Sequence, residues 1–261
     1  MRELDRRATT MSHAKLRIRR VREVYHKAQT LWLPERRTDR AGLAGLSHTW
    51  KDVHIPALQR RVADQMLANL EEGIVDPVFV PVIEALNALP LEHFSLLDAA
   101  CATGYYSEVV QSQVPKPVQY RGCDFSSAMI EQARRYYPDL QFDVEDLTGL
   151  TYPDRGFDVV LLSGALEHIP GFEDAVSEAC RVCSSYLILH RCPLTSGSEH
   201  EYTAGSQYNI ETSRIYFSRR PLINGFAQHG LALDREVNRS ILRGPAEAPV
   251  RTVVTFVFKR E

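Results

Sequence analysis

Two aspartates follow apolar runs that look like successive buried strands, where carboxylates could contact a ligand. Asp98 lies near the end of the run Phe94–Ala99, and Asp124 follows the run Val118–Cys123. Small residues crowd the turn from Asp98 to Gly104, which lets a ligand approach the backbone closely. Asp124 lies 20 residues after Gly104, where a carboxylate can accept both hydroxyls of a ribose. The spacing therefore predicts a ligand that contains a nucleoside.

The first turn departs from the pattern of dinucleotide-binding proteins, which use G-x-G-x-x-G so that the backbone cradles a pyrophosphate. This chain has Ala100 and Ala102 where glycines would help, and Tyr105 directly after its single Gly104. Two methyl groups would crowd a pyrophosphate, whereas a ligand with an amino-acid tail and no phosphate would tolerate them. S-adenosylmethionine fits that description.

From about residue 93 the sequence alternates between short apolar runs and helical segments, which predicts a parallel sheet with helices on both faces. After an expected helix at Arg220–His229, two expected strands at Leu231–Val237 and Arg251–Phe258 follow with no helix between them. We therefore expect the last strand to enter as an antiparallel hairpin. The other expected strands are Phe94–Ala99, Val118–Cys123, Leu140–Val144, Phe157–Leu162 and Tyr186–His190, and the helices between them are Tyr105–Val114, Ser126–Tyr136 and Phe172–Val182.

Four motifs, in this order and at this spacing, resemble class I S-adenosylmethionine-dependent methyltransferases. They are Leu97–Gly104, Gly122–Ile130, Asp146-Leu147 and the stretch Phe157–Ile169. The resemblance covers about residues 93–192 well and the last 70 residues loosely. It implies an α/β fold with a Rossmann-like, seven-stranded, mostly parallel sheet and an antiparallel last strand. It also implies a methyltransferase domain at residues 91–261 that binds S-adenosylmethionine, preceded by a helical extension at residues 1–90.

The resemblance assigns the cofactor contacts. The first turn would border the methionine part, Asp124 would hold the ribose, and Asp146 would lie near the adenine amino group. Ala102 stands where glycine is more usual in the family. This difference affects the expected affinity for the cofactor more than it affects the identification of the family. Asp98 or Asp124 alone could simply cap the helix that follows, but capping explains the pair poorly. The expected cofactor-binding residues are Asp98, Ala99, Ala100, Thr103, Gly104, Asp124, Phe125, Met129, Asp146, Leu147 and Ser163.

Two histidines are candidate catalytic bases, because a neutral imidazole can take a proton near pH 7. His168 and His190 follow or end expected strands and would project toward the cleft, with Glu167 a possible partner that orients His168. The alternative is that both are hydrogen-bonded structural histidines. The expected reaction is methyl transfer to a small-molecule acceptor, with oxygen the expected acceptor atom in secondary or sugar metabolism, and S-adenosylhomocysteine the product.

The segment Pro193–Ser218 is expected to line or cover the active site, since long insertions at this edge of a sheet commonly do so. The alternative is a solvated loop whose tyrosines pack on the core. The N-terminal helices are expected to form the other wall, with Trp50 near the cofactor. The side chains of interest in the segment are His200, Tyr202, Tyr208, Arg214 and Tyr216.

Cys180-x-x-Cys183, followed by His190 and Cys192, has a superficial likeness to a zinc site. A second C-x-x-C is missing, and the pairs fall on different elements, so buried thiols are the favoured interpretation and no metal is expected. Five cysteines are an odd count in a chain that shows no export signal, which disfavours a disulfide framework.

Charge divides the chain of 261 residues into two parts. Residues 1–40 hold 12 Lys/Arg against 5 Asp/Glu, so they carry +7 and the remaining 221 residues carry −9. Within the basic part, apolar residues at helical spacing (Ile18, Val21, Tyr25, Ala28 and Trp32) predict an amphipathic helix. This helix leaves open an RNA or protein methyltransferase as the first alternative. A second alternative is a non-catalytic or NAD-type nucleotide-binding module.

The overall composition is that of an ordinary globular protein, with 44% hydrophobic and 25% charged residues. The sequence shows no apolar stretch long enough to span a membrane and no signal peptide. We therefore expect a cytoplasmic protein, and the oligomeric state stays open.

Overall fold

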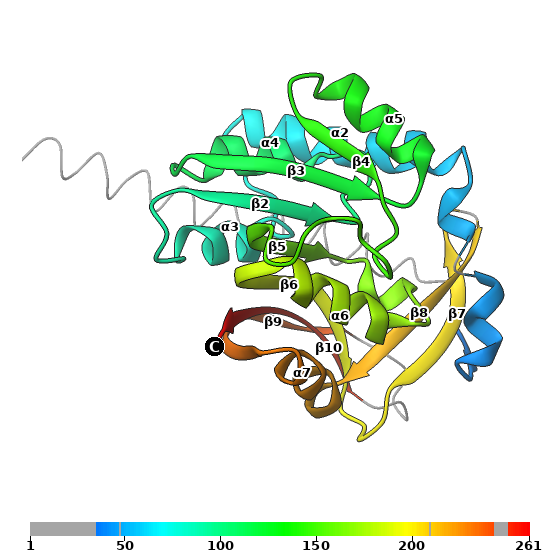
Figure 1. Ribbon diagram of the computed structural model, residues 1–261. Helices are drawn as coiled ribbons and strands as arrows, with labels where there is room; N and C mark the ends of the chain where they lie inside the picture. Colours follow the sequence, from blue (N-terminus) through cyan, green and yellow to red (C-terminus); the bar gives the residue numbers. More distant parts are fainter. Residues whose placement is uncertain (1–34, 47, 209, 243–249) are drawn as a thin grey trace, which may run out of the picture.

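The computed structural model describes residues 35–46, 48–208, 210–242 and 250–261, and its centre is a mixed sheet (Figure 1). Seven strands follow one another in the order β4-β3-β2-β5-β6-β10-β9. The first five are parallel, and β10 is antiparallel to both of its neighbours. This confirms the predicted sheet and its antiparallel last strand. The bounds are β2 (Phe94–Ala99), β3 (Val118–Asp124), β4 (Gln141–Val144), β5 (Phe157–Ser163), β6 (Cys183–Thr195), β9 (Leu231–Leu242) and β10 (Arg251–Arg260).

The order of the strands reverses between β2 and β5, because the chain runs outward through β3 and β4 and then returns to the other side of β2. In open α/β sheets such a reversal leaves a crevice at the carboxyl ends of the strands. Both faces of the sheet are covered, so β5 is a continuous apolar run. Its residues alternate between two cores, with Val159 and Leu161 in one and Val160 and Leu162 in the other.

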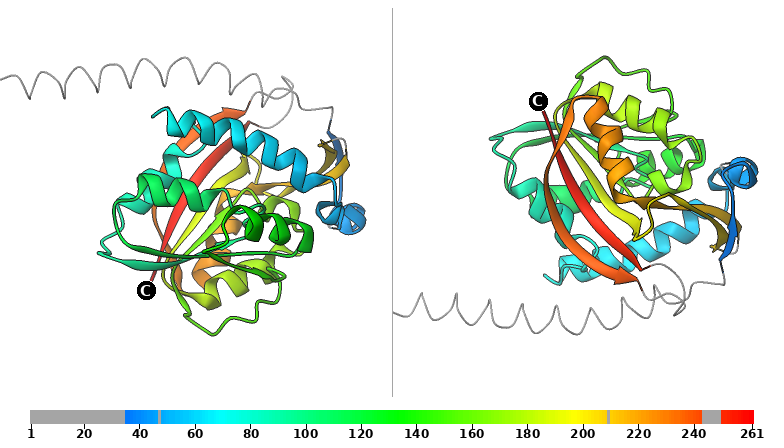
Figure 2. Two further views of the ribbon diagram at one scale, coloured as in Figure 1. Left: turned by 90° about the horizontal axis from the view of Figure 1, so that it is seen from above. Right: turned by 90° about the horizontal axis from the view of Figure 1, so that it is seen from below.

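Helices cover the two faces of the sheet (Figures 1 and 2). The first core contains residues of α2 (Ile55–Glu71), α3 (Val80–Asn87), α4 (Tyr106–Gln113) and α5 (Ser127–Tyr136). The second contains residues of α6 (Phe172–Val182) and α7 (Arg219–Gln228). The helices predicted at Tyr105–Val114, Ser126–Tyr136, Phe172–Val182 and Arg220–His229 agree with α4, α5, α6 and α7 within one residue at each end. The described residues also form three short 3-10 helices, η1 (Ala41–Leu46), η2 (Thr49–Lys51) and η3 (Leu166–His168).

The segment Pro193–Ser218, interpreted from the sequence as a loop, forms the end of β6 and a β-hairpin. β7 (Glu201–Gln207) and β8 (Ile210–Ser218) are antiparallel, and β1 (Arg36–Thr38) adds a third strand beside β7. β8 joins the central sheet by pairing in parallel with the last two residues of β6. The many polar residues of this segment break the apolar pattern that predicts a strand, although its Thr, Tyr and Ile side chains fit a pleated, half-buried surface well. We call β1, β7 and β8 the three-stranded extension.

The basic amphipathic helix predicted around Ile18–Trp32 lies outside the described residues. Among the described residues, none of the helices combines the length and apolar character that crossing a membrane requires.

Candidate active site

A cavity of about 860 Å³ lies at the carboxyl ends of β2 to β6, where the strand order reverses. α2 closes it on one side, and the three-stranded extension closes it at the far end. Eight of the predicted cofactor-binding residues line it. Four of them belong to the ends of β2 and β3 or the turn after β2 or β3, namely Asp98, Ala100, Asp124 and Phe125. The other four come from α5 and from the ends of β4 and β5, namely Met129, Asp146, Leu147 and Ser163.

The turn after β2 has a left-handed backbone. Ala100 and Ala102 have φ of 63° and 53°, and Gly104 has φ of 76°. Left-handed backbone costs an L-residue roughly 1–2 kcal/mol, so the two alanines store strain where glycines would not. Gly104 is also sterically required, since a Cβ there would lie 2.7 Å from the Phe142 ring. The alanines singled out in the sequence thus mark strained positions.

Asp124 is buried at the end of β3, and each of its oxygens accepts one backbone N–H. Oδ2 accepts from Ala102 at 3.0 Å, and Oδ1 accepts from Ser126 at 2.9 Å. Burial raises the pKa of Asp124 to about 6, and the two N–H donors oppose the rise. Each carboxylate oxygen has further acceptor capacity, which matches a diol on a ligand in the cavity.

Asp98 is buried at the end of β2, and its Oδ2 accepts a hydrogen bond of 2.5 Å from the Tyr120 hydroxyl. Burial raises the pKa of Asp98 to about 7; the Tyr120 hydroxyl opposes the rise and the charge of Asp124 adds to it. Two desolvated carboxyl groups thus lie beside one cavity, an arrangement that is expensive unless a ligand supplies donors.

The side of the cavity near β3 and β4 combines apolar side chains with a carboxylate at its rim. Met129 is buried. The Lys51 ammonium lies over the Phe125 ring, 5.0 Å from its centroid. Asp146 is exposed at the rim, where its Oδ1 accepts from the Thr148 N–H and hydroxyl. Leu147 is buried beside it.

His168, on η3, lines the cavity in a defined tautomer. Its Nδ1 lies 2.6 Å from the carbonyl oxygen of Ser213, which can only accept, so Nδ1 carries the proton and Nε2 has the lone pair. Burial lowers the pKa of His168 to about 3, and Arg214 and Arg191 lower it further. The expectation that Glu167 orients the ring is wrong, because the Ser213 carbonyl takes that place.

The structure does not bring His190 to the cavity. Its Nδ1 lies 2.8 Å from the Thr255 hydroxyl, the residue is 1% exposed, and its ring packs against Tyr106. Burial lowers its pKa to about 3. The expectation that His190 projects into the cleft fails because β10 covers this side chain. Ala99, Thr103 and Gly104 also lie behind the cavity wall and do not line it.

The far compartment of the cavity holds residues that the motif analysis did not reach. Trp50 lines it and packs against His168, with ring centroids 4.7 Å apart, and Tyr208 meets Trp50 edge-on at 6.1 Å. Arg191 and Arg214 line the same compartment. They come from the end of β6, from β8 and from residues before α2, so only the fold assembles them. Trp50 and the segment Pro193–Ser218 were the only signals in the sequence.

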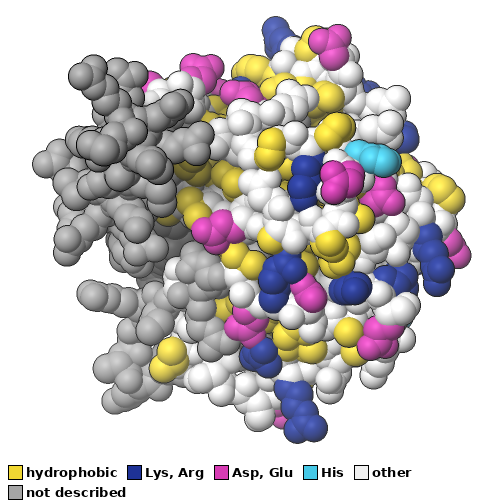
Figure 3. Space-filling view, turned by 90° about the vertical axis from the view of Figure 1, so that its left-hand side faces the viewer, with side chains coloured by type: hydrophobic (Ala, Val, Ile, Leu, Met, Phe, Trp, Pro, Cys, Tyr) yellow, Lys and Arg dark blue, Asp and Glu magenta, His cyan; other side chains and the backbone are white. Residues whose placement is uncertain are grey.

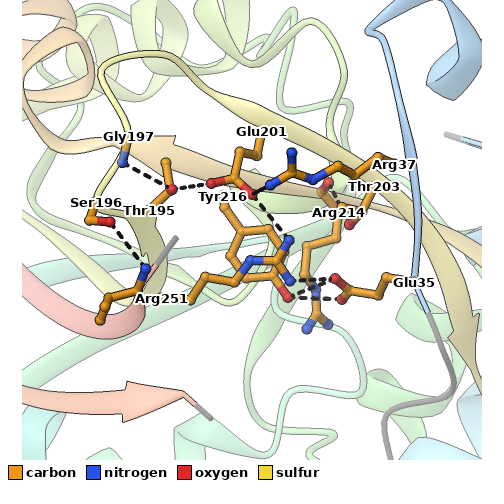
Figure 4. Close-up of polar contacts among 11 residues, drawn as sticks. Glu35, Arg37, Thr195, Ser196, Gly197, Glu201, Thr203, Arg214, Tyr216 and Arg251 are labelled. Atoms are coloured by element: carbon orange, nitrogen blue, oxygen red, sulfur yellow. Dashed lines mark hydrogen bonds and ion pairs between the residues drawn. The ribbon is translucent and has the colours of Figure 1, made fainter. Parts of the chain in front are cut away.

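A buried ionic cluster fastens the three-stranded extension beside this compartment (Figure 4). Arg251 of β10 bonds Glu35 at 2.8 Å and Glu201 at 3.1 Å, and its guanidinium stacks on Tyr216 at 3.7 Å. The Tyr216 hydroxyl donates to Glu35 at 2.8 Å. All three charged side chains are less than 15% exposed. The cluster therefore ties β1, β7, β8 and β10 together.

Within the described part of the chain, the side chains of His, Cys, Asp and Glu form no group of three or more that could hold a metal ion. All five cysteines are buried, free thiols. On the face shown in Figure 3, basic and acidic side chains are interspersed over the described surface.

Comparison with known proteins gives one family match, in which residues 96–185 match the model of a methyltransferase domain. A SAM-dependent methyltransferase from Methanosarcina mazei is similar in structure, with a TM-score of 0.53, 16% identity, and coverage of 69% of this chain and 97% of that one. The YcgJ protein from Bacillus subtilis gives a TM-score of 0.54 at 14% identity, over 70% of this chain and 98% of its own.

A third similar structure covers more of this chain. It is the 1,6-didemethyltoxoflavin-N1-methyltransferase of Burkholderia thailandensis, with a TM-score of 0.53, 14% identity, and coverage of 87% of this chain and 95% of that one. No curated protein matches the sequence. At these identities the structural likenesses show a shared fold.

Proposed function

Residues 96–185 of this chain are a methyltransferase domain in the class I, S-adenosylmethionine-dependent fold, and on that premise we propose that the protein methylates an oxygen of a small-molecule acceptor. The observation that carries the proposal is the continuous cavity of about 860 Å³ at the carboxyl ends of the strands. One end of it has the carboxylates Asp124 and Asp146, and the other end has the aromatic and basic side chains around His168.

The residues present fit the cofactor. Asp124 would accept the ribose hydroxyls, whose donors would compensate for its burial. Phe125 and Met129 would flank the adenine, with Asp146 and the Leu147 backbone at its edge. Asp98 and the first turn would border the methionine part. The Ser163 Oγ and the Gln59 Oε1 are buried polar atoms without a partner among the described residues, as expected beside a polar ligand.

When bound, S-adenosylmethionine would supply a methyl group on a sulfonium, from which S-adenosylhomocysteine is a good leaving group. The protein then has to align the acceptor oxygen, exclude water and take a proton. Alignment can lower such a barrier by roughly 7–11 kcal/mol at best. Enclosure of the cavity by α2 and the three-stranded extension serves the first two tasks.

We assign His168 as the base that takes the proton from the acceptor hydroxyl. Its Nε2 lone pair can accept a hydrogen bond from the acceptor hydroxyl, because Ser213 holds the other ring nitrogen. A methylated hydroxyl that still carries its proton is a far stronger acid than an imidazolium. His168 can therefore take that proton even though its surroundings lower its pKa. A positioned base of this kind contributes roughly 10²–10⁴ in rate.

Calorimetric titration of S-adenosylhomocysteine into the purified protein tests the cofactor assignment, with NAD as comparator and Asp124→Ala as control. Micromolar binding that the variant loses is the expected result, and it justifies a screen of acceptors with radiolabelled methyl donor. Stronger binding of NAD would instead support the nucleotide-binding module. Binding of neither ligand would leave the protein without an assigned cofactor and remove the basis of the proposal.

The division of the chain into a cap at residues 1–90 and a methyltransferase domain at 91–261 is part of the proposal, supported by the cavity contacts of Trp50 and α2. The charge of +7 on residues 1–40 favours RNA as the second candidate acceptor. RNA binding that weakens steeply with salt and disappears when residues 1–34 are deleted would support it.

A further inference from the structure

The far compartment of the cavity presents hydrogen-bond donors and aromatic faces. Arg191 and Arg214 each carry guanidinium donors, and the indole of Trp50 can only donate. Trp50 Nε1 is buried and has no partner among the described residues. The indole N–H, beside two positively charged guanidinium groups in one cavity, suits a ligand that brings acceptor oxygens.

Arg214 belongs to β8 of the three-stranded extension, whereas Arg191 belongs to β6 and lines the same cavity. Figure 4 shows the guanidinium of Arg214 on the side of the ionic cluster where Glu35 lies, and the charges of Glu167 and Glu35 favour its charged form. Arg191 has a left-handed backbone, with φ of 60°, and its guanidinium carbon lies 3.5 Å from where a Cβ on Gly164 would be. The guanidinium of Arg191 thus lies beside Gly164 at the end of β5, at ordinary van der Waals distance from where a Cβ would be.

The acidic residue Glu167 is buried, lines the same cavity and interacts electrostatically with both arginines. Burial raises the pKa of Glu167, with Arg214 and Arg191 opposing the rise, and burial lowers the pKa of Arg214. The aromatic rings of Trp50, His168 and Tyr208 form one wall of the same compartment. A flat ring could lie against this wall while its charged group meets the arginines.

We propose that the methyl acceptor is a planar aromatic acid, whose carboxylate is bound by Arg214 with help from Arg191 and whose ring packs on Trp50. The proposal rests on the proposed function, because it names the substrate class of the same site. The carboxylate is an anchor in this arrangement, and the acceptor oxygen lies toward His168.

Benzoate binding to the protein saturated with S-adenosylhomocysteine tests the proposal, with benzamide and cyclohexanecarboxylate as matched probes. Benzamide removes the charge and cyclohexanecarboxylate removes the flat ring. We expect benzoate to bind at least tenfold more tightly than either. Equal affinity for benzoate and benzamide, or the absence of benzoate binding, overturns the proposal.

Arg214→Gln is expected to weaken benzoate binding at least tenfold, whereas Arg214→Lys keeps the charge and retains most of the affinity. Equal losses of benzoate affinity in Arg214→Gln and Arg214→Lys would show that the positive charge of residue 214 does not bind the carboxylate, which would overturn the proposal. Arg36→Gln is the control, because Arg36 also belongs to the extension but is exposed and does not line the cavity. S-adenosylhomocysteine affinity, measured separately for each protein, distinguishes failure of the proposed function from failure of the anion site.

Discussion

Asp124 accepts a hydrogen bond from the backbone N–H of Ala102 at 3.0 Å, so the carboxylate at the end of β3 holds the strained turn after β2. One side chain therefore has two tasks, since it shapes the turn and faces the cavity. A variant at this position changes the pocket as well as its charge.

Asp124→Ala is expected to weaken S-adenosylhomocysteine binding by tenfold to several hundredfold. A hydrogen bond to a charged group contributes about 1.5–3 kcal/mol, and the variant loses the acceptor for both ribose hydroxyls. Calorimetry measures the effect. Asp139→Ala, at a residue outside the cavity, is the matched control, and an unchanged affinity in Asp124→Ala would contradict the ribose assignment.

Binding of S-adenosylhomocysteine is expected to weaken as the pH falls below about 6, approaching tenfold per pH unit. The pKa of Asp124 is raised to about 6, so below that pH the carboxyl is protonated and accepts the ribose hydroxyls less well. The measurement is affinity against pH between 5 and 8. Affinity that stays constant over this range, in protein shown to be folded, would count against an ionised Asp124 as the acceptor.

Asp98→Asn is expected to stabilise the ligand-free protein strongly at pH 8 and much less at pH 5. The unfolded carboxyl ionises near 3.8, whereas burial raises the pKa of Asp98 to about 7 in the folded protein, so the cost of ionisation to folding grows between these two pH values and is fully present above pH 7. An asparagine keeps an acceptor for Tyr120 and carries no charge. Thermal melting of both proteins at pH 5 and pH 8 measures the effect. An equal change in melting temperature at the two pH values would show that the charge of Asp98 is not the cause.

The left-handed turn predicts opposite outcomes for two small substitutions. Ala102→Gly relieves backbone strain and is expected to be neutral or stabilising by up to about 1 kcal/mol. Gly104→Ala introduces strain and a contact with Phe142, so it should cost about 2–4 kcal/mol. Denaturant unfolding measures both, and a stable Gly104→Ala protein would mean that the turn has another shape.

Arg251→Met is expected to lower the free energy of unfolding by about 3 kcal/mol, since it removes the cation that the largely buried Glu35 and Glu201 share and leaves Glu35 with the Tyr216 hydroxyl alone. Arg36→Met is the matched control on the same extension. Its ion pair with Glu211 is exposed, and such pairs contribute less than about 1 kcal/mol. Equal losses in the two variants would show that the buried cluster has no special role.

The sequence predicts the cofactor half of the site far better than the acceptor half. Asp98 and Asp124 lie at strand ends that apolar periodicity makes visible, and parallel pairing brings adjacent strand ends to one edge. Trp50 lies on η2, Arg191 on β6 and Arg214 on β8, so only tertiary packing brings them together, and the polar strands of the hairpin give no such signal. His190 shows the same limit, because a position at the end of a strand does not say which neighbour covers the side chain.

β6 links the hairpin to the central sheet, since it pairs with β5 and β10 over most of its length and with β8 only through its last two residues. The hairpin that lines the far compartment is thus attached at one end of a central strand and shares little backbone pairing with the half that faces Asp124. Chimaeras that exchange residues 196–218 alone should therefore change which acceptor is methylated and leave the nucleoside pocket unchanged.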